Sequence, residues 1–213
     1  TYVPIMLFVA LIIAVLLNSK FIKGKPFFRA AVYLPNITAM IAAAFTFQLL
    51  LDKNFGLLNL ILSHIGIDKI NWLGTPWGAK VSIDLVMIWR WLGYNAIIML
   101  AGLQSIPQHL YEAAKIDGAS PIKRFFKITI PLMKPVILFC VILSTIGTFK
   151  MFTEVFVMTQ GGPANETITP VLYLYNMGFE AGNFGYAASI ANILILITLI
   201  LSVIQLRIGE DNS

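Results

Sequence analysis

Three charged residues lie within long apolar stretches of the sequence, where a charge is costly. Arg90 lies about nine residues into the apolar run that begins at Val81. An isolated charge at the centre of a bilayer costs about 2.5 to 3.5 kcal/mol on insertion scales, so Arg90 must face protein or water. Lys150 and Glu154 are four residues apart, a spacing at which two side chains on one helix neutralise each other. This spacing favours a structural pair, while an ion path or the binding of a phosphorylated solute stays open.

Uncharged polar residues in the same stretches form a second set. Ser144, Thr148 and Met151 recur at helical spacing and are expected to share one helix face, and Asn95 lies in the apolar run before them. Hydroxyl residues in lipid often hold helices together, which is one interpretation of this set. The other is a neutral polar lining for a sugar, whose hydroxyl groups need hydrogen-bonding partners once they leave water.

The segment 105–131 carries strong signals for two short helices. Pro107 fits the first turn of a helix and Gly118 fits its left-handed C-terminal cap. We therefore expect a helix of about eleven residues, or about 16 Å. Ser120 followed by Pro121 repeats the start signal, so a second short helix should follow immediately.

Two short helices joined at a glycine would form a compact knob. Ala113 and Ala114 keep part of it narrow enough for a partner's backbone to approach, and Glu112 and Asp117 offer carboxylates at its edge. This shape suits insertion into a groove of another protein. An ordinary pair of interfacial helices has the same local chemistry and remains the alternative.

Residues for catalysis by this chain are missing from the sequence. No Gly-x-x-x-x-Gly-Lys-Ser/Thr run occurs, so the chain is not expected to hydrolyse ATP. His64 and His109 lie in different segments, and no Ser, His and carboxylate grouping is present. The single cysteine, Cys140, excludes an internal disulfide and most cysteine metal sites. We therefore expect no catalytic residue, no metal site and no cofactor held by this chain.

The elements that position these residues are expected to be membrane spans. Of the 213 residues, 58 % are hydrophobic and 12 % are charged, with a mean hydropathy of +0.83. Such a chain has too little polar surface to cover a soluble globule. We predict an all-α, polytopic bundle of transmembrane helices, because a chain in lipid must satisfy its own backbone hydrogen bonds and no barrel-like alternation is present. Five stretches approach or exceed the roughly 20 residues of a span: 1–18, 30–51, 81–103, 133–158 and 186–206.

The charges between these stretches predict the orientation. Ten Lys and Arg residues lie in segments 19–29 and 104–134 and after the last span, against three in segment 52–80. The positive-inside rule therefore places the first two segments and the C-terminus in the cytoplasm. This clustering also explains the net charge of +5 without any binding of nucleic acid. The ten are Lys20, Lys23, Lys25, Arg29, Lys115, Lys123, Arg124, Lys127, Lys134 and Arg207.

This orientation puts Thr1 outside the cell, an unusual start for a chain without a leader. We therefore expect at least one further span upstream of Thr1. No soluble domain, linker or internal repeat interrupts the sequence, and we interpret residues 1–213 as a single transmembrane domain that contains the loop 105–131.

Three spaced motifs in this sequence resemble those of one transporter family. Glu112-Ala113-Ala114, Gly118 and Ile128-Thr129-Ile130-Pro131 are similar to the EAA loop of ABC-importer permeases, with Ile130 where the family more often has Leu. Four further segments look like the carbohydrate branch of that family, the maltose and glycerol-phosphate type. They are Leu103 to Pro107, Asp117 to Ser120, Thr159 to Pro163 and Gly185 to Ala188.

The resemblance implies a multi-pass permease of the bacterial inner membrane with a type I importer fold. Such a permease takes up a sugar or a related polar solute by alternating access. It would work with separate ATPase subunits that bind ATP and Mg, with a second and different permease chain, and with an extracytoplasmic solute-binding protein. The EAA loop would dock in the ATPase and couple it to transport through Glu112, Ala113, Ala114, Asp117 and Gly118.

The resemblance also implies a solute site at mid-membrane. In the maltose-type family this site draws on positions that align with Gly93, Asn95 and Ala96 and with Ser144, Thr148 and Met151. Thr148 and Met151 stand where the maltose permease has amides, so a maltose specificity is not implied. The segment 161–185 resembles the outer gate region that meets the solute-binding protein.

Two alternatives to a sugar permease remain. One is a self-sufficient secondary transporter or channel with an ion path through Arg90, Lys150 and Glu154. The other is an ABC permease for amino acids or metals. The docking loop separates the first alternative from an importer permease, because an ion-driven carrier has no need of a knob for an ATPase.

Overall fold

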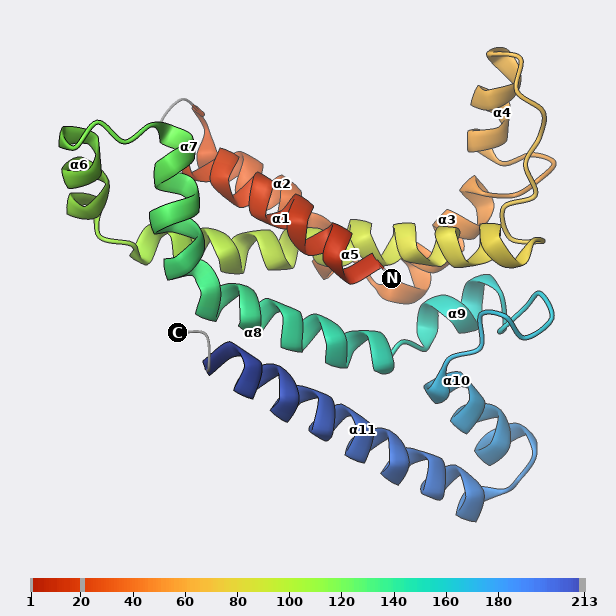
Figure 1. The fold of residues 1–213 in the computed structure, drawn as a ribbon. Coiled ribbons are helices and arrows are strands. Elements are labelled where there is room, and N and C mark those ends of the chain that lie inside the picture. The colour runs from red at the N-terminus through yellow and green to blue at the C-terminus, as the bar shows by residue number, and fades with distance from the viewer. Residues whose placement is uncertain (1, 20–21, 211–213) are drawn as a thin grey trace.

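Helices and the loops between them make up the part of the chain that the computed structural model describes, residues 2–19 and 22–210. Thr1 and Lys20, which entered the predicted orientation, lie outside the described residues. The helices run roughly along one another, with α6 and α7 at one end of the bundle and α4, α9 and α10 at the other (Figure 1). They are α1 Tyr2–Asn18, α2 Lys25–Ile37, α3 Met40–Leu50, α4 Leu57–His64, α5 Pro76–Ser105, α6 Gln108–Ile116, α7 Pro121–Arg124, α8 Ile130–Phe149, α9 Thr153–Met158, α10 Pro170–Tyr175 and α11 Phe184–Glu210, with π-helical turns η1 Phe125–Thr129 and η2 Asn176–Glu180.

The described residues contain three helices that are long and apolar enough to cross a membrane, rather than the five predicted. They are Pro76–Ser105, Pro121–Phe149 and Phe184–Gly209. Helices α2 and α3 together make a fourth candidate, but they are bent by 91° at the residues between them. Helix α1 is apolar but has only 17 residues. The all-helical membrane bundle is thus confirmed, with three or four candidate spans.

Two predicted spans were wrong as continuous helices. The stretch 30–51 breaks between Ile37, where α2 ends, and Met40, where α3 begins, and the side chain of Arg90 donates to the Thr38 carbonyl at this break. The stretch 133–158 ends as a helix at Phe149, and α9 begins separately at Thr153. There the hydroxyl of Thr169 donates a hydrogen bond of 2.8 Å to the carbonyl of Met151, which replaces a helical partner for that carbonyl.

Three helix starts follow one local rule, a hydroxyl residue before a proline. Thr75, Ser120 and Thr169 precede the prolines that open α5, α7 and α10, and each hydroxyl accepts a hydrogen bond from a backbone N–H of the first turn. Proline suits the first helical position, where its missing N–H removes no helical bond. The start of the second short helix at Ser120 and Pro121 is therefore confirmed.

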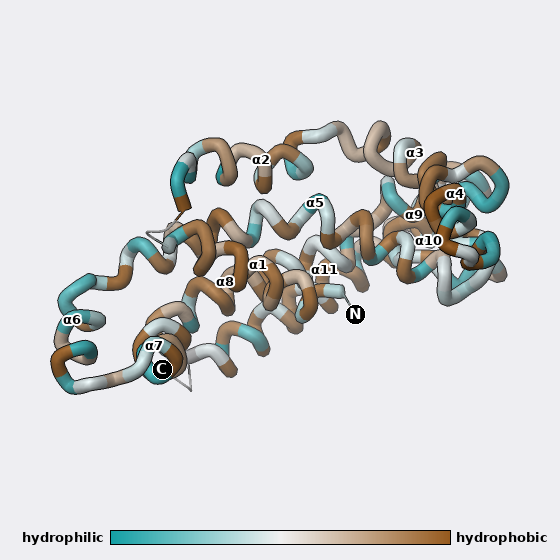
Figure 2. The backbone as a smooth tube through the Cα atoms, turned by 90° about the horizontal axis from the view of Figure 1, so that it is seen from above, coloured by the Kyte–Doolittle hydropathy of each residue, from teal (hydrophilic) through white to brown (hydrophobic). Residues whose placement is uncertain are grey.

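The core of the bundle lies between α1 and α5. Met6, Ala10 and Ala14 of α1 have no exposed surface, and they belong to the same buried cluster as Met87 and Met99 of α5. Small residues let two helices in lipid approach closely. Hydrophilic residues gather at the two ends of the bundle, around α6 and around α4 and α9, while the helices between them are mainly hydrophobic (Figure 2). This distribution is that of a protein that crosses a bilayer.

Candidate functional site

A small cavity between α1, α5 and α8 brings Asn95 and Ser144 together, as the sequence predicted. Its volume is about 30 Å³, room for about a water molecule but far below the roughly 300 to 1,000 Å³ of small-molecule sites. A sugar therefore needs these helices to separate. The cavity is lined by Tyr2, Met6, Trp91, Tyr94, Asn95, Leu143, Ser144 and Gly147.

Asn95 is the polar residue of this cavity with unused hydrogen-bonding capacity. Its side chain is 1 % exposed, and its amide nitrogen donates to the carbonyl of Trp91 at 3.0 Å. Its side-chain oxygen has no hydrogen-bond partner among the described residues. A buried acceptor of this kind is costly to leave unpaired, so it is a candidate to receive a donor from a solute or from water.

The other predicted pathway residues lie in different surroundings. The hydroxyl of Thr148 donates to the carbonyl of Ser144 at 2.8 Å and lies 2.9 Å from the hydroxyl of Tyr2, so it fastens α8 to α1. Ala96 is fully buried in the core. A Cβ at Gly93 would overlap the carbonyl oxygen of Val32 on α2, so Gly93 lies at a helix crossing.

Met151 does not share a helix face with Ser144 and Thr148, and this expectation was wrong. Because α8 ends at Phe149, Met151 is non-helical and lines a second pocket at the N-terminal end of α5. This pocket has a volume of about 210 Å³. Its polar lining comes from Lys80, Asp84, Glu166, Thr167 and Thr169.

The expected pair of Lys150 and Glu154 is also wrong. Lys150 caps the end of α8 and is exposed, whereas Glu154 is 7 % exposed in α9, and the structure shows no ion pair between them. The helix break removes the spacing of four residues along one helix on which the pairing depended. Glu154 instead experiences the positive charge of Arg90, with which it forms no ion pair. Arg90 faces protein as expected, with one guanidinium nitrogen 2.6 Å from the carbonyl oxygen of Thr38.

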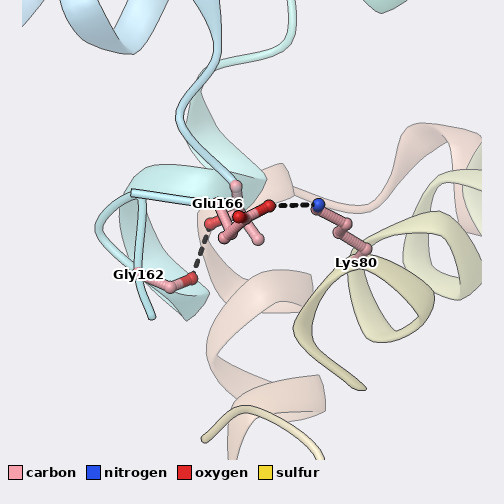
Figure 3. Close-up of polar contacts among 4 residues, drawn as sticks. Lys80, Gly162 and Glu166 are labelled. Carbon is pink, nitrogen blue, oxygen red and sulfur yellow. Dashed lines mark hydrogen bonds and ion pairs between the residues drawn. The ribbon is translucent and has the colours of Figure 1, made fainter. Parts of the chain in front are cut away.

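An ion pair at the N-terminal end of α5 was not predicted from the sequence. The ammonium of Lys80 at the start of α5 lies 2.5 Å from the carboxylate of Glu166 in the loop before α10 (Figure 3). The hydrogen bond and the charge of Lys80 hold the pKa of Glu166 below its usual value. Next to Glu166, the Thr167 hydroxyl donates to the carbonyl of Gly162 at 2.7 Å. Asp84, one helical turn from Lys80, lines the same pocket as this pair.

The predicted knob is confirmed as two helices joined at Gly118. Gly118 has φ +73°, the N–H of Gly118 bonds to Lys115 and the N–H of Ala119 bonds to Ala114, which is the pattern of a glycine C-cap. Helix α6 has nine residues, because Pro107 is its N-cap rather than part of its first turn. Four of the five predicted docking residues are exposed, and Ala114 is half-buried.

The second helix of the knob is longer than predicted. It continues through the π-helical turn η1 into α8, so Pro121–Phe149 is one helix of 29 residues. The hydroxyl of Tyr111 on α6 lies 2.8 Å from that of Thr129 at the end of η1. The knob is thus joined to α5 through Ile106 and Pro107, and to α8 through both η1 and this hydrogen bond.

Residues 1–210 match the family of binding-protein-dependent transport system inner membrane components, and the chain belongs to this family. It is 44 % identical over 216 residues to the lactose transport system permease protein LacF of Rhizobium radiobacter, covering 99 % of this chain and 72 % of that protein. It is 39 % identical to the arabinooligosaccharides transport system permease protein AraP of Halalkalibacterium halodurans, covering 96 % and 65 %. It is 38 % identical to the trehalose/maltose transport system permease protein MalF of Thermococcus litoralis, covering 92 % and 66 %.

Solved structures show the same fold. A chain of a bacterial ABC transporter that imports the acidic polysaccharide alginate superposes with a TM-score of 0.86 at 23 % identity, over 95 % of this chain and 72 % of that one. The alginate transporter in complex with a pentasaccharide-bound periplasmic protein gives 0.85 at 24 % identity, over 96 % and 73 %. The chain is therefore a multi-pass inner-membrane permease subunit of an ABC importer, a transport component and not an enzyme, for which no cofactor is expected.

Proposed function

We propose that this chain forms the transmembrane path for a sugar or oligosaccharide, moved by alternating access that separate ATPase subunits drive. The relatives reported above are named for lactose, arabinooligosaccharides, and trehalose and maltose. The cavity between α1, α5 and α8 is the observation that supports saccharide transport by this chain. There the buried side-chain oxygen of Asn95, without a partner among the described residues, is available to a solute hydroxyl beside Ser144.

The solute path we propose runs from the pocket at the N-terminal end of α5, called here the outer pocket, to this cavity. Met151 lines the outer pocket, and Asn95 and Ser144 line the inner one. Gly93, Ala96 and Thr148 act on the path by setting how closely α2, α1 and α8 pack around α5. Because the inner cavity has a volume of only about 30 Å³, passage of a sugar requires α1, α5 and α8 to move apart.

The knob is the docking surface for an ATPase subunit that binds ATP and Mg. Glu112, Ala113 and Asp117 are exposed, and Ala114 is half-buried. Ile116 beside them is 87 % exposed, an apolar side chain suited to a groove on a partner. Gly118 gives the turn its shape without presenting a side chain.

The knob and the C-terminus face the cytoplasm in this proposal. Lys115, Lys123, Arg124 and Lys127 lie on or next to the knob, as the positive-inside rule requires of a cytoplasmic segment. At the opposite end, the segment 161–185 meets the solute-binding protein. A second, different permease chain completes the transmembrane assembly, and residues 1–213 form one permease domain.

Uptake by the reconstituted importer tests this proposal. The chain in its full-length form is placed in proteoliposomes with its second permease chain, ATPase and binding protein. Radiolabelled lactose, arabinose oligosaccharides, trehalose and maltose are supplied outside, with glutamine as a control. We expect ATP-dependent uptake of at least one saccharide and none of glutamine. Uptake that survives removal of the ATPase and collapses with the ion gradient would contradict the proposal.

A further inference from the structure

The bend between α2 and α3 leaves a backbone carbonyl that no helical N–H satisfies, and Arg90 of α5 supplies the donor. The guanidinium nitrogen Nη1 of Arg90 donates to the carbonyl oxygen of Thr38 at 2.6 Å, and Thr38 is the residue that ends α2. In lipid, an irregular backbone is tolerated only where protein satisfies its polar groups. The 91° bend and Arg90 therefore depend on each other.

A carboxylate on α9, that of Glu154, is near enough to feel the charge of Arg90 but forms no ion pair with it. Glu154 of α9 is 7 % exposed and interacts electrostatically with Arg90. Helix α9 packs against α3, where Met158 belongs to the same buried cluster as Ala44, Leu51 and Val86. Arg90 thus contacts the end of α2 by a hydrogen bond and reaches the α3–α9 pair by charge.

The helices on the two sides of the bend pack differently. Helix α2 packs along α5, and Gly93 lets the backbone of α2 at Val32 approach α5 one turn from Arg90. Helix α3 packs mainly against α9 rather than α5. The bend is consequently the joint between two units, α2 with α5 and α3 with α9, and Arg90 lies at that joint.

Helix α5 connects this joint directly to the knob. It is a single helix of 30 residues with Arg90 near its middle, and only Ile106 and Pro107 separate its end from α6. A tilt of α5 that begins at α6 therefore displaces Arg90 together with the Thr38 carbonyl to which it donates. Packed helices transmit such movements as rigid elements.

We propose that Arg90 is a positioning residue that fixes the bend between α2 and α3 and passes movement of α5 to the outer α3–α9 unit. Its planar guanidinium donates to the Thr38 carbonyl and stays charged beside Glu154 at the same time, which a neutral side chain cannot do. Arg90 acts through the bend and does not contact solute. The importance of this movement for import rests on the proposed function; the geometry of the bend does not.

The first test measures the bend and needs no solute. Cys140 is the single cysteine, so a Cys140→Ala background leaves introduced cysteines as the labelling sites. Spin labels are attached at Phe27→Cys on α2 and Phe45→Cys on α3, where the native side chains are 72 % and 53 % exposed. Pulsed electron paramagnetic resonance on the complete complex should give a narrow distance distribution between the two labels. Arg90→Met/Glu154→Gln, which stays neutral and therefore avoids a buried unpaired carboxylate, should broaden it. An unchanged distribution in this double variant would overturn the proposal.

The second test measures import against ATP hydrolysis in the same complexes. The double variant should keep ATPase activity while import per ATP falls about tenfold, within the range of couplings between sites in proteins. Arg90→Lys alone, with Glu154 unchanged, should recover part of the import per ATP. Lys150→Met, which removes an exposed cation, should change neither ATPase activity nor import per ATP. Import per ATP at the wild-type level in the double variant would overturn the proposal. If the wild-type complex imports no saccharide, the proposed function fails while the distance measurement still decides on Arg90.

Discussion

The hydroxyl groups of Tyr111 on α6 and Thr129 at the end of η1 lie 2.8 Å apart, and this hydrogen bond closes a ring between the two helices of the knob. The ring also includes the turn at Gly118 and the π-helical turn η1. A knob that is joined at two places to α8 and at one place to α5 moves as a unit. Force applied to α6 therefore reaches α5 and α8, two of the three helices that line the cavity of Asn95 and Ser144.

Removal of this hydrogen bond should loosen the knob without moving its surface residues. We expect Tyr111→Phe to lower the stability of the chain by about 0.5 to 1.5 kcal/mol, the usual net contribution of one hydrogen bond. Thermal unfolding of the purified permease measures this effect. Thr129→Val should have an effect of similar size, and the double variant should add little to it. Full additivity of the two changes would show that the hydroxyls do not interact.

The turn at Gly118 should depend on backbone conformation alone. A Cβ at Gly118 would meet no atom within 4 Å, but its φ of +73° is strained for other residues. Gly118→Val should therefore cost about 1 to 2 kcal/mol and reduce ATPase stimulation by the binding protein. Gly118→Asn, which tolerates the left-handed region better, should retain most of that stimulation. Equal activity of the valine and asparagine variants would contradict this reason for the glycine.

Gly93 should be intolerant of even one methyl group, for a different reason. The added Cβ would overlap the carbonyl oxygen of Val32, which belongs to the backbone of α2 and cannot rotate away. We expect Gly93→Ala to destabilise the chain by about 1 to 3 kcal/mol, as overpacking usually does. Gly185→Ala is the matched control, since nothing lies within 4 Å of its Cβ position. The comparison uses thermal unfolding in detergent, and equal melting temperatures would contradict the close crossing.

The outer loop should release from α5 in acid. Lys80 lowers the pKa of Glu166 in the folded chain, so the ion pair stabilises the loop above the unfolded pKa of about 4.3. This stabilisation is lost as the pH falls through the lowered pKa of the folded state. Cysteine labels at Trp77 and Asn165 in a Cys140→Ala background should separate below about pH 4. In Glu166→Gln, the label distance should no longer respond to pH in this range, and a response equal to the wild type would exclude Glu166 as its source.

The local features of the knob were predictable because each depends on residues close in sequence. Ser120 with Pro121 marks a helix start, and Gly118 marks a left-handed cap, whatever the rest of the chain does. Asn95 and Ser144 do line one cavity, but most of its other lining residues are apolar or aromatic. The solute role of both residues stays a prediction.

The breaks in the helices depend on distant residues and were therefore not visible in the apolar pattern. Arg90 donates a hydrogen bond to the Thr38 carbonyl, 52 positions away in the sequence. The Thr169 hydroxyl donates to the Met151 carbonyl, 18 positions away. Without such partners a continuous helix is the expected state of an apolar stretch, so 30–51 and 133–158 were interpreted as single spans. The same breaks account for the wrong pairing of Lys150 with Glu154.

The location and partner of the knob decide whether a separate ATPase drives this permease. A cysteine at Ala113 in the Cys140→Ala background can be tested for cross-linking to the ATPase subunit in inside-out and right-side-out vesicles. We predict a cross-link to the ATPase that changes in yield with ATP, and labelling by a membrane-impermeant maleimide only in inside-out vesicles. Labelling of this cysteine from the outside of the cell, or the absence of any cross-link in an intact complex, would contradict the account.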